Sequence, residues 1–189
     1  TIMLSVPSLA KSFKKNIESG VKAKGKFVEW MYETALKNAI AYNKEGYNKG
    51  SGLSFWRKPF VSLFDKLVFK SVRQALGGEM RFFVGGGALL DIDLQRYYYA
   101  IGIPMYQGYG LSEATPIISA NSMENHILGS SGCVVKPMEI KILDDNGKEL
   151  PYGERGEICI KGENVMAGYW KNPKSTADTI VDGWLHTGD

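Results

Sequence analysis

The sequence has little cysteine and no long apolar run. Only two of its 189 residues are cysteine, Cys133 and Cys159, and their separation does not match any metal-ligand spacing. Two unpaired thiols are typical of a reducing compartment, and a single disulfide stays open as an alternative. The apolar runs are too short for a transmembrane helix, and no signal peptide is visible at the N-terminus. These absences predict a cytoplasmic protein.

Several catalytic motifs are also missing. No GxxxxGK[ST] phosphate loop occurs, and the two histidines, His126 and His186, lack the partners of a hydrolase triad, so both are expected to be structural or surface residues. Gly108 and Gly110 begin like the GxGxxG dinucleotide fingerprint, but Glu113 occupies the position of the third glycine. A dinucleotide-dependent oxidoreductase is therefore a weak alternative.

The composition is ordinary for a globular protein, with 44% apolar and 23% charged residues. A chain of this length buries roughly 70% of its unfolded surface. The net charge of +3 hides an asymmetry, because residues 1–80 carry 14 basic and 6 acidic residues and the rest carry 9 and 14. The basic part is expected to form solvated lysine faces, and contact with phosphates or with an anionic membrane surface is the alternative.

Three amphipathic helices are predicted in the first 80 residues. Apolar side chains repeat every three or four positions in three segments, residues 9–21, 27–39 and 60–72. Pro7 and Ser8 precede the first segment, and Ser8 is the expected helix cap. The aromatic residues of these stripes are expected to pack into the core.

A strand–helix–strand unit is predicted next. The apolar strand 81–84 is followed by three glycines, the helix 94–101 is capped by Asp91, and the strand 104–107 leads into Gly108. Such a unit favours parallel pairing with a right-handed crossover. Both glycine loops should then lie at the carboxyl ends of neighbouring strands, which is where open α/β sheets bind ligands.

The last third is predicted to form a small, mostly antiparallel β lobe. Apolar and polar residues alternate in 138–142 and 157–161, and the sequence DDNG at 144–147 is a turn signal. The predicted fold class is therefore α/β, with a parallel core and N-terminal helices followed by this lobe. We expect residues 1–132 to form part of the α/β domain and residues 133–189 to form the β-rich lobe.

Two segments carry residues suited to a nucleotide. In YGLSE, Tyr109 offers a flat face for a base, Gly110 permits close approach, Ser112 suits a phosphate oxygen and Glu113 suits Mg²⁺. The alternative is that Ser112 and Glu113 only favour the start of a helix. In GWLHTGD, Asp189 can accept hydrogen bonds from ribose hydroxyls.

The order of four motifs resembles the AMP-forming acyl-CoA synthetases of the adenylate-forming superfamily. These motifs are GGGALL, YQGYGLSEATP, GERGEICIKGENVMAGYW and DGWLHTGD. The opening VPSLAKSFKKNI, with the helical block that follows, is most similar to the long-chain fatty acid branch. Together the resemblance covers nearly the whole chain.

The resemblance implies a set of roles. Tyr109 would stack on adenine, Ser112 would contact the α-phosphate, Glu113 would bind Mg²⁺ and Asp189 would hold the ribose. Ser112 and Glu113 would thus be the catalytic residues. The nucleotide-binding set that it implies is Gly86, Gly87, Ala88, Gln107, Gly108, Tyr109, Gly110, Ser112 and Asp189.

The implied reaction joins a fatty acid to coenzyme A (CoA) at the expense of ATP, through acyl-AMP. The family's lysine-bearing phosphate loop would precede Thr1, and its small C-terminal lysine domain would follow Asp189, so this piece alone is expected to be inactive. Fatty acid, ATP and CoA are the expected partners, with no nucleic acid and with peripheral membrane contact as a hypothesis. A ligase for another carboxylic acid and a non-catalytic nucleotide-binding module are the alternatives.

Overall fold

The structure, a computed structural model, describes residues 1–189, and its contacts divide the chain into two compact units. Unit 1 contains Thr1–Gly108 and Asn121–Gly132, and unit 2 contains Tyr109–Ala120 and Cys133–Asp189. The sequence prediction divided the chain once, after residue 132. The contacts instead group Tyr109–Ala120 with the C-terminal segment.

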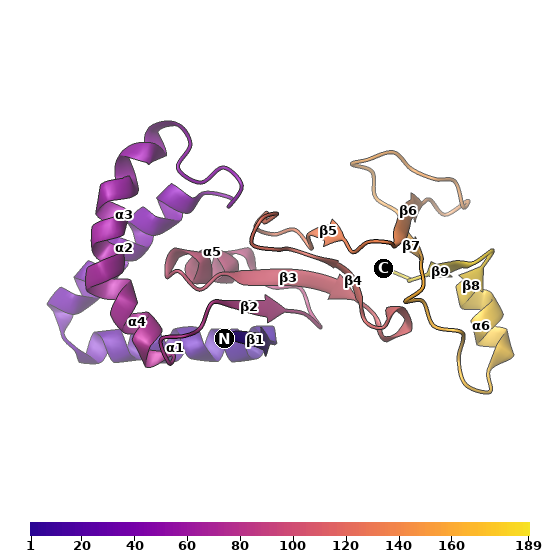
Figure 1. The fold of residues 1–189 in the computed structure, drawn as a ribbon, viewed down its shortest axis with the longest axis horizontal. Coiled ribbons are helices and arrows are strands. Elements are labelled where there is room, and N and C mark those ends of the chain that lie inside the picture. The colour runs from indigo at the N-terminus through magenta and orange to yellow at the C-terminus, as the bar shows by residue number, and fades with distance from the viewer. The chain divides into compact units, whose positions relative to one another are not determined.

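Unit 1 is built on parallel strands, as predicted. Strand β1 (Ile2–Ser5) pairs with β2 (Phe82–Gly85), which pairs with β3 (Met105–Gly110), and both pairs are parallel (Figure 1). The register aligns Gly85 with Gln107, so the glycine turn after β2 starts beside the carboxyl half of β3. This geometry follows from the crossover between the two strands through helix α5 (Ile92–Ala100).

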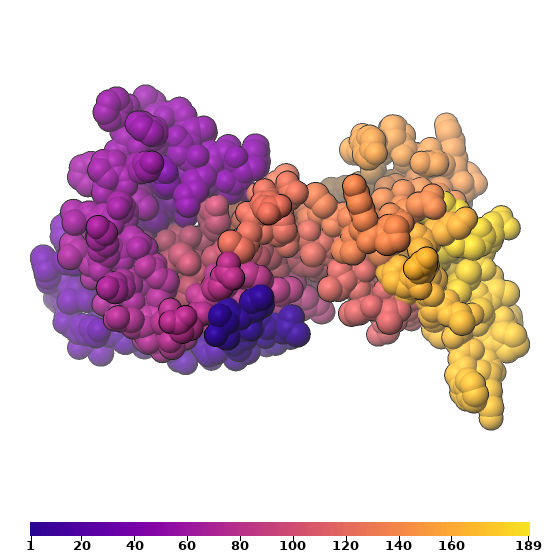
Figure 2. Space-filling view, viewed as in Figure 1, coloured from indigo at the N-terminus to yellow at the C-terminus, as the bar shows by residue number.

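Helices fill most of the rest of unit 1, and Figure 2 shows those of residues 7–75 as one continuous body, coloured indigo to magenta. Their bounds are α1 Pro7–Ala23, α2 Lys26–Asn43, the 3₁₀ helix η1 Gly52–Arg57, α3 Lys58–Phe64, the π-helical turn η2 Asp65–Phe69, α4 Lys70–Ala75 and α5 Ile92–Ala100. The predicted third helix is therefore interrupted by a π turn. No helix of the chain combines the length and apolarity needed to cross a membrane.

The core of unit 1 centres on Phe83, which is fully buried on β2. Its ring contacts Phe13 of α1 and Tyr98 of α5, so both helices pack on the same face of the sheet. The Tyr98 hydroxyl donates to the Ala10 carbonyl at 2.7 Å, which satisfies a buried polar group inside this interface. The helix α5 begins at the predicted cap, because the Asp91 carboxylate accepts two backbone N–H bonds.

Two sequence expectations for the helices are wrong. Ser8 does not cap α1, because Pro7 already occupies the first helical position and Val6 is the N-cap residue. The aromatic stripes are not wholly core, since Phe27, Trp30 and Phe60 are more than half exposed. On α2 the smaller members of the stripe, Ala35 and Ala39, are buried instead.

Unit 2 is mostly antiparallel, and the α/β class with a separate antiparallel sheet is confirmed. Its four-stranded sheet has the order β6-β7-β9-β8. The elements of the unit are the 3₁₀ turn η3 Ser112–Ala114, β4 Ile117–Ala120, β5 Cys133–Val134, β6 Glu139–Leu143, β7 Glu157–Lys161, α6 Pro173–Thr179, β8 Ile180–Val181 and β9 Trp184–His186. Its core contains Ala114, Ile118, Ile160 and Leu185.

The predicted turn at residues 144–147 is present. The Gly147 N–H donates to the Asp144 carbonyl at 2.9 Å, and the Asp144 carboxylate accepts from the backbone of Asn146 and Lys148. The strand that pairs with β6 does not follow this turn directly, because β7 starts only at Glu157. Both cysteines are free, so the disulfide alternative has no support.

Candidate functional site

The glycine turn of unit 1 is held by a buried glutamine. The Gln107 side chain, 5% exposed, accepts from the Leu90 N–H at 2.8 Å and donates to the carbonyls of Ala88 and Gly108 at 3.3 and 3.2 Å. Gly87 has φ +75°, a conformation that favours glycine. The amide of Gln107 is thus fully engaged in shaping the turn, which leaves the backbone of residues 86–88 at the surface.

Two more buried amides support the same region. Gln95 on α5 donates to the Leu90 carbonyl at 3.0 Å and accepts from the Gly129 N–H at 3.1 Å. Asn121 donates to the Gln107 carbonyl at 3.1 Å. Buried amides with all partners in place rigidify the segment they join, so the end of β2 and the middle of β3 are fixed by side chains that the sequence analysis did not weigh.

Close packing requires a glycine at position 110. A Cβ atom there would lie 1.8 Å from the Pro116 carbonyl oxygen, a distance that no side chain tolerates. The segment between them folds tightly back and ends with Thr115 at φ 50°. A β-branched residue with positive φ is an outlier, and such strain is typical of functional loops. The Thr115 hydroxyl donates to the Asn164 carbonyl and helps to hold this conformation.

Unit 2 brings Tyr109 and Asp189 together from opposite ends of its sequence. The Tyr109 hydroxyl donates to the Asp189 carboxylate across 2.6 Å. Burial and this hydrogen bond raise the pKa of Tyr109 to about 12, so the hydroxyl keeps its proton at neutral pH. A half-buried aromatic ring therefore lies directly beside an exposed carboxylate.

Glu113 lies on the 3₁₀ turn η3 and has one oxygen engaged. Its Oε1 accepts from the Tyr169 hydroxyl at 3.0 Å, while its backbone carbonyl accepts from the Met166 N–H at 2.8 Å. The hydrogen bond to Glu113 raises the pKa of Tyr169. The second carboxylate oxygen has no protein partner, which leaves it available as a hard ligand. Ser112, the preceding residue, is exposed.

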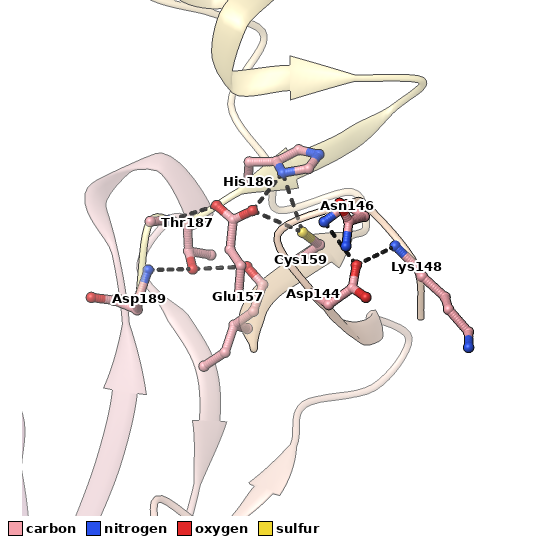
Figure 3. A network of polar contacts seen from close by, with 10 residues as sticks. Asp144, Asn146, Lys148, Glu157, Cys159, His186, Thr187 and Asp189 are labelled. Carbon is pink, nitrogen blue, oxygen red and sulfur yellow. Dashed lines mark hydrogen bonds and ion pairs between the residues drawn. The ribbon is translucent and has the colours of Figure 1, made fainter. Parts of the chain in front are cut away.

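A carboxylate from β7 holds the loop that carries Asp189 (Figure 3). Glu157 Oε1 accepts from the Gly188 N–H at 3.0 Å, and Glu157 Oε2 lies 2.7 Å from His186 Nδ1. The Ile158 N–H also donates to the Asp189 carbonyl at 3.1 Å. The hydrogen bond with His186 is the main reason that the pKa of Glu157 is lowered. The sequence analysis missed Glu157 and gave His186 no partner.

The predicted site residues thus divide between the units. Tyr109 and Asp189 meet within unit 2, which also contains Gly110, Ser112 and Glu113. The remaining residues of the predicted set belong to the end of β2, the turn after it and β3 in unit 1, namely Gly86, Gly87, Ala88, Gln107 and Gly108. A flat ring beside a carboxylate suits a nucleoside, which stacks its base and offers two ribose hydroxyls as donors.

Comparison with known proteins places the chain in a family. The profile of the AMP-binding enzymes matches residues 1–170, and the chain belongs to this family of AMP-binding enzymes. A long-chain-fatty-acid–CoA ligase of Mycobacterium bovis, FadD15, is 32% identical over 189 residues, which is 100% of this chain and 29% of that protein. The chain therefore spans less than a third of the length of this relative.

Solved structures agree with this assignment. An anthranilate CoA ligase in complex with anthranoyl-AMP has a TM-score of 0.55 and 33% identity, covering 58% of this chain and 21% of that one. The o-succinylbenzoate coenzyme A synthetase of Bacillus subtilis, in complex with ATP and magnesium ion, has a TM-score of 0.53 and 31% identity. That match covers 64% of this chain and 27% of the synthetase.

Proposed function

We propose that this chain supplies the adenylate-binding part of an AMP-forming ligase that activates a long-chain fatty acid. The ligase would join the acid to AMP, releasing pyrophosphate, and then pass the acyl group to the thiol of CoA. The observation that carries this proposal is the 2.6 Å contact between Tyr109 and Asp189, which are 80 residues apart. It places a stacking face and a hydrogen-bond acceptor side by side, as a base and its ribose require.

The residue roles follow from the chemistry of each group. The Tyr109 ring would stack on adenine, and Asp189 would accept hydrogen bonds from the ribose hydroxyls. Ser112, exposed at the start of η3, would donate to the α-phosphate. The backbone of residues 86–88 in unit 1, shaped by Gln107, would offer N–H groups to a ligand. Gly108 would let the ligand approach β3 without a side chain between them, whereas Gly110 serves the close packing against the Pro116 carbonyl.

Magnesium fits the free oxygen of Glu113. A Mg²⁺ held by Glu113 would supply positive charge to offset that of the ATP phosphates. The protein's own part is to hold Glu113 in place through Tyr169 and through the backbone bond from Met166. Positioning the two anions and offsetting their charge is where such an enzyme lowers the barrier.

The fatty acid is proposed because of the long-chain relative and the similar N-terminal helical block. A ligase for another acid is the second candidate, because the solved structures similar to this chain include an enzyme bound to anthranoyl-AMP. Both candidates share the adenylation step and differ only in the acid. We further propose a cytoplasmic enzyme with CoA as its second substrate.

ATP–pyrophosphate exchange by the full-length protein tests this proposal. The assay follows exchange with acetate, octanoate, palmitate and benzoate in turn, with Asp189→Ala as a matched variant that is expected to need more ATP for the same exchange. We expect exchange with palmitate and little with acetate. Exchange with benzoate alone would retain adenylation and overturn the fatty acid. No exchange with any acid, from a folded protein that binds ATP, would favour a non-catalytic nucleotide-binding module.

A further inference from the structure

A cluster of three metal-binding side chains lies in unit 2 outside the proposed nucleotide contacts. Glu157 and Cys159 are two residues apart on β7, so their side chains share one face of the strand. His186 on β9 is the direct cross-strand partner of Cys159 in the antiparallel register. Figure 3 shows the three side chains pointing toward one another. The sheet itself therefore assembles a carboxylate, a thiol and an imidazole.

The three ligand atoms form a closed triangle. Cys159 Sγ lies 3.5 Å from His186 Nδ1 and 3.8 Å from Glu157 Oε2, and the oxygen lies 2.7 Å from Nδ1. Tetrahedral coordination at the usual zinc bond lengths separates ligand atoms by about 3.4 to 3.6 Å. Both separations that involve sulfur are close to this value. Only the carboxylate and the imidazole must move apart, by roughly 0.7 Å.

Hydrogen bonds among these three side chains cannot satisfy all three ligand atoms at once. His186 Nδ1 has a single proton or a single lone pair, so it cannot both donate to Glu157 and accept from Cys159. The 3.8 Å contact between Cys159 and Glu157 is a weak hydrogen bond, because a thiol is a poor donor. A cation at the centre would satisfy all three atoms at once. A thiolate and a carboxylate would together balance the charge of a divalent ion.

We propose that Glu157, Cys159 and His186 bind Zn²⁺ through three protein ligands, with a fourth position open to solvent. A thiolate and an imidazole select zinc over magnesium, which prefers oxygen ligands in octahedral geometry. The fully buried Cys159 closes one side, while His186 and Glu157 are partly exposed and give an entry path. Glu157 keeps Oε1 on the Gly188 N–H, so a bound ion would leave this support of the Asp189 loop intact.

Cobalt substitution tests the site directly. Chelator-treated protein is titrated with Co²⁺ and followed by its thiolate-to-cobalt absorption in the near ultraviolet. We expect one ion per chain, displacement of the signal by Zn²⁺, and no change with millimolar Mg²⁺. Cys159→Ser, His186→Gln and Glu157→Gln should each weaken binding by more than the 10- to 100-fold that loss of an outer-shell partner causes. Cys133→Ser removes the other, exposed thiol and should change nothing.

Thermal unfolding provides a second readout that does not depend on nucleotide binding. Zn²⁺ should raise the Tm of the wild type in proportion to the logarithm of its concentration, and should not do so in His186→Gln. If Cys159→Ser does not fold, His186→Gln and Glu157→Gln, which change partly exposed residues, provide the test. Equal binding in folded His186→Gln, or loss of the cobalt signal in Cys133→Ser, would overturn the proposal. Failure to bind AMP would count against the proposed function and leave the zinc site standing.

Discussion

At the scale of single residues, the pair Tyr109 and Asp189 has the sharpest consequence. Asp189→Ala should weaken AMP binding to the full-length protein by about 1–3 kcal/mol, because hydrogen bonds from the ribose to a charged group are lost. Tyr109→Phe keeps the stacking ring and removes only the bond to Asp189, so its effect should be smaller. Isothermal titration with AMP measures both. An unchanged affinity in a folded Asp189→Ala protein would refute the ribose role.

Glu113 should act on the metal rather than on the base. Glu113→Ala removes the free carboxylate oxygen, so ATP–pyrophosphate exchange should fall steeply while the affinity for metal-free AMP changes little. Tyr169→Phe serves as the control, because it removes the hydrogen bond to Glu113 and leaves the carboxylate. For Tyr169→Phe we expect only a modest rise in the Mg²⁺ concentration needed for half-maximal exchange. Wild-type exchange in Glu113→Ala would exclude the metal role.

The burial of His126 predicts that the stability of the protein depends on pH. It is 7% exposed, lies between the rings of Tyr99 and Tyr106, and neither ring nitrogen has a hydrogen-bond partner. Burial lowers the pKa of His126 below its usual 6.5. The unfolded chain therefore binds this proton first as the pH falls, so stability is complete above about pH 6.5 and declines toward the lower folded pKa.

His126→Phe should remove this decline, because the ring is kept and the proton site is lost. Free energies of unfolding from urea titrations at pH 7.5, 6.5 and 5.5 give the comparison. The difference between variant and wild type cancels the other titrating groups. As the pH falls, the free energy of unfolding of the variant should rise relative to that of the wild type. Parallel curves would show that His126 has the same pKa in the folded and the unfolded chain, and would contradict the assignment.

At the scale of elements, Gln107 joins β3 to the turn that follows β2. Gln107→Leu would leave the buried Leu90 N–H without its partner, which costs about 1–3 kcal/mol, and would release the part-buried carbonyls of Ala88 and Gly108 to solvent. We expect a matching drop in the free energy of unfolding and faster hydrogen exchange at the Leu90 amide. Gln74→Leu, on the exposed side of α4, should change stability by less than about 0.5 kcal/mol. Similar losses in both variants would rule out a specific role.

Patterns with a short period were readable from the sequence. The four-residue repeat gave α1, the cap at Asp91 gave the start of α5, and the alternation in residues 157–161 gave β7. The repeat did not predict which of its apolar side chains are buried. Phe27 and Trp30 share a stripe with Ala35, yet only the alanine reaches the core.

The candidate site was predicted in part, because a motif specifies residue types but not partners. The contact between Glu157 and the loop of Asp189 could not be predicted, because nothing in the sequence fixes the register between β7 and β9. One available signal went unused. Asp182 and Gly183 form the two-residue turn between β8 and β9, and this dipeptide is a strong hairpin signal. With that hairpin in place, His186 would have been expected on a strand.

At the scale of the whole molecule, the charge asymmetry suggests contact with an anionic membrane surface. Residues 1–80 carry a net +8, and α3 to α4 expose both apolar and basic side chains. The exposed apolar residues there are Phe60, Leu63 and Leu67, and the exposed lysines beside them are Lys58, Lys66 and Lys70. Apolar side chains flanked by cations are the combination that binds lipid interfaces. We expect the protein to bind phosphatidylserine vesicles at low salt.

A matched pair of triple variants separates this patch from overall charge. Changing Lys58, Lys66 and Lys70 to Glu lowers the net charge by six, and so does changing the exposed Lys136, Lys148 and Lys174. Each lysine near an anionic surface contributes about 1 kcal/mol, so only the first variant should lose vesicle binding in a flotation assay. Binding of the wild type should also fade as salt is raised, because the Debye length shortens to about 8 Å at 0.15 M. Equal loss in both variants would mean that net charge alone attracts the protein, and no binding at low salt would exclude the membrane contact.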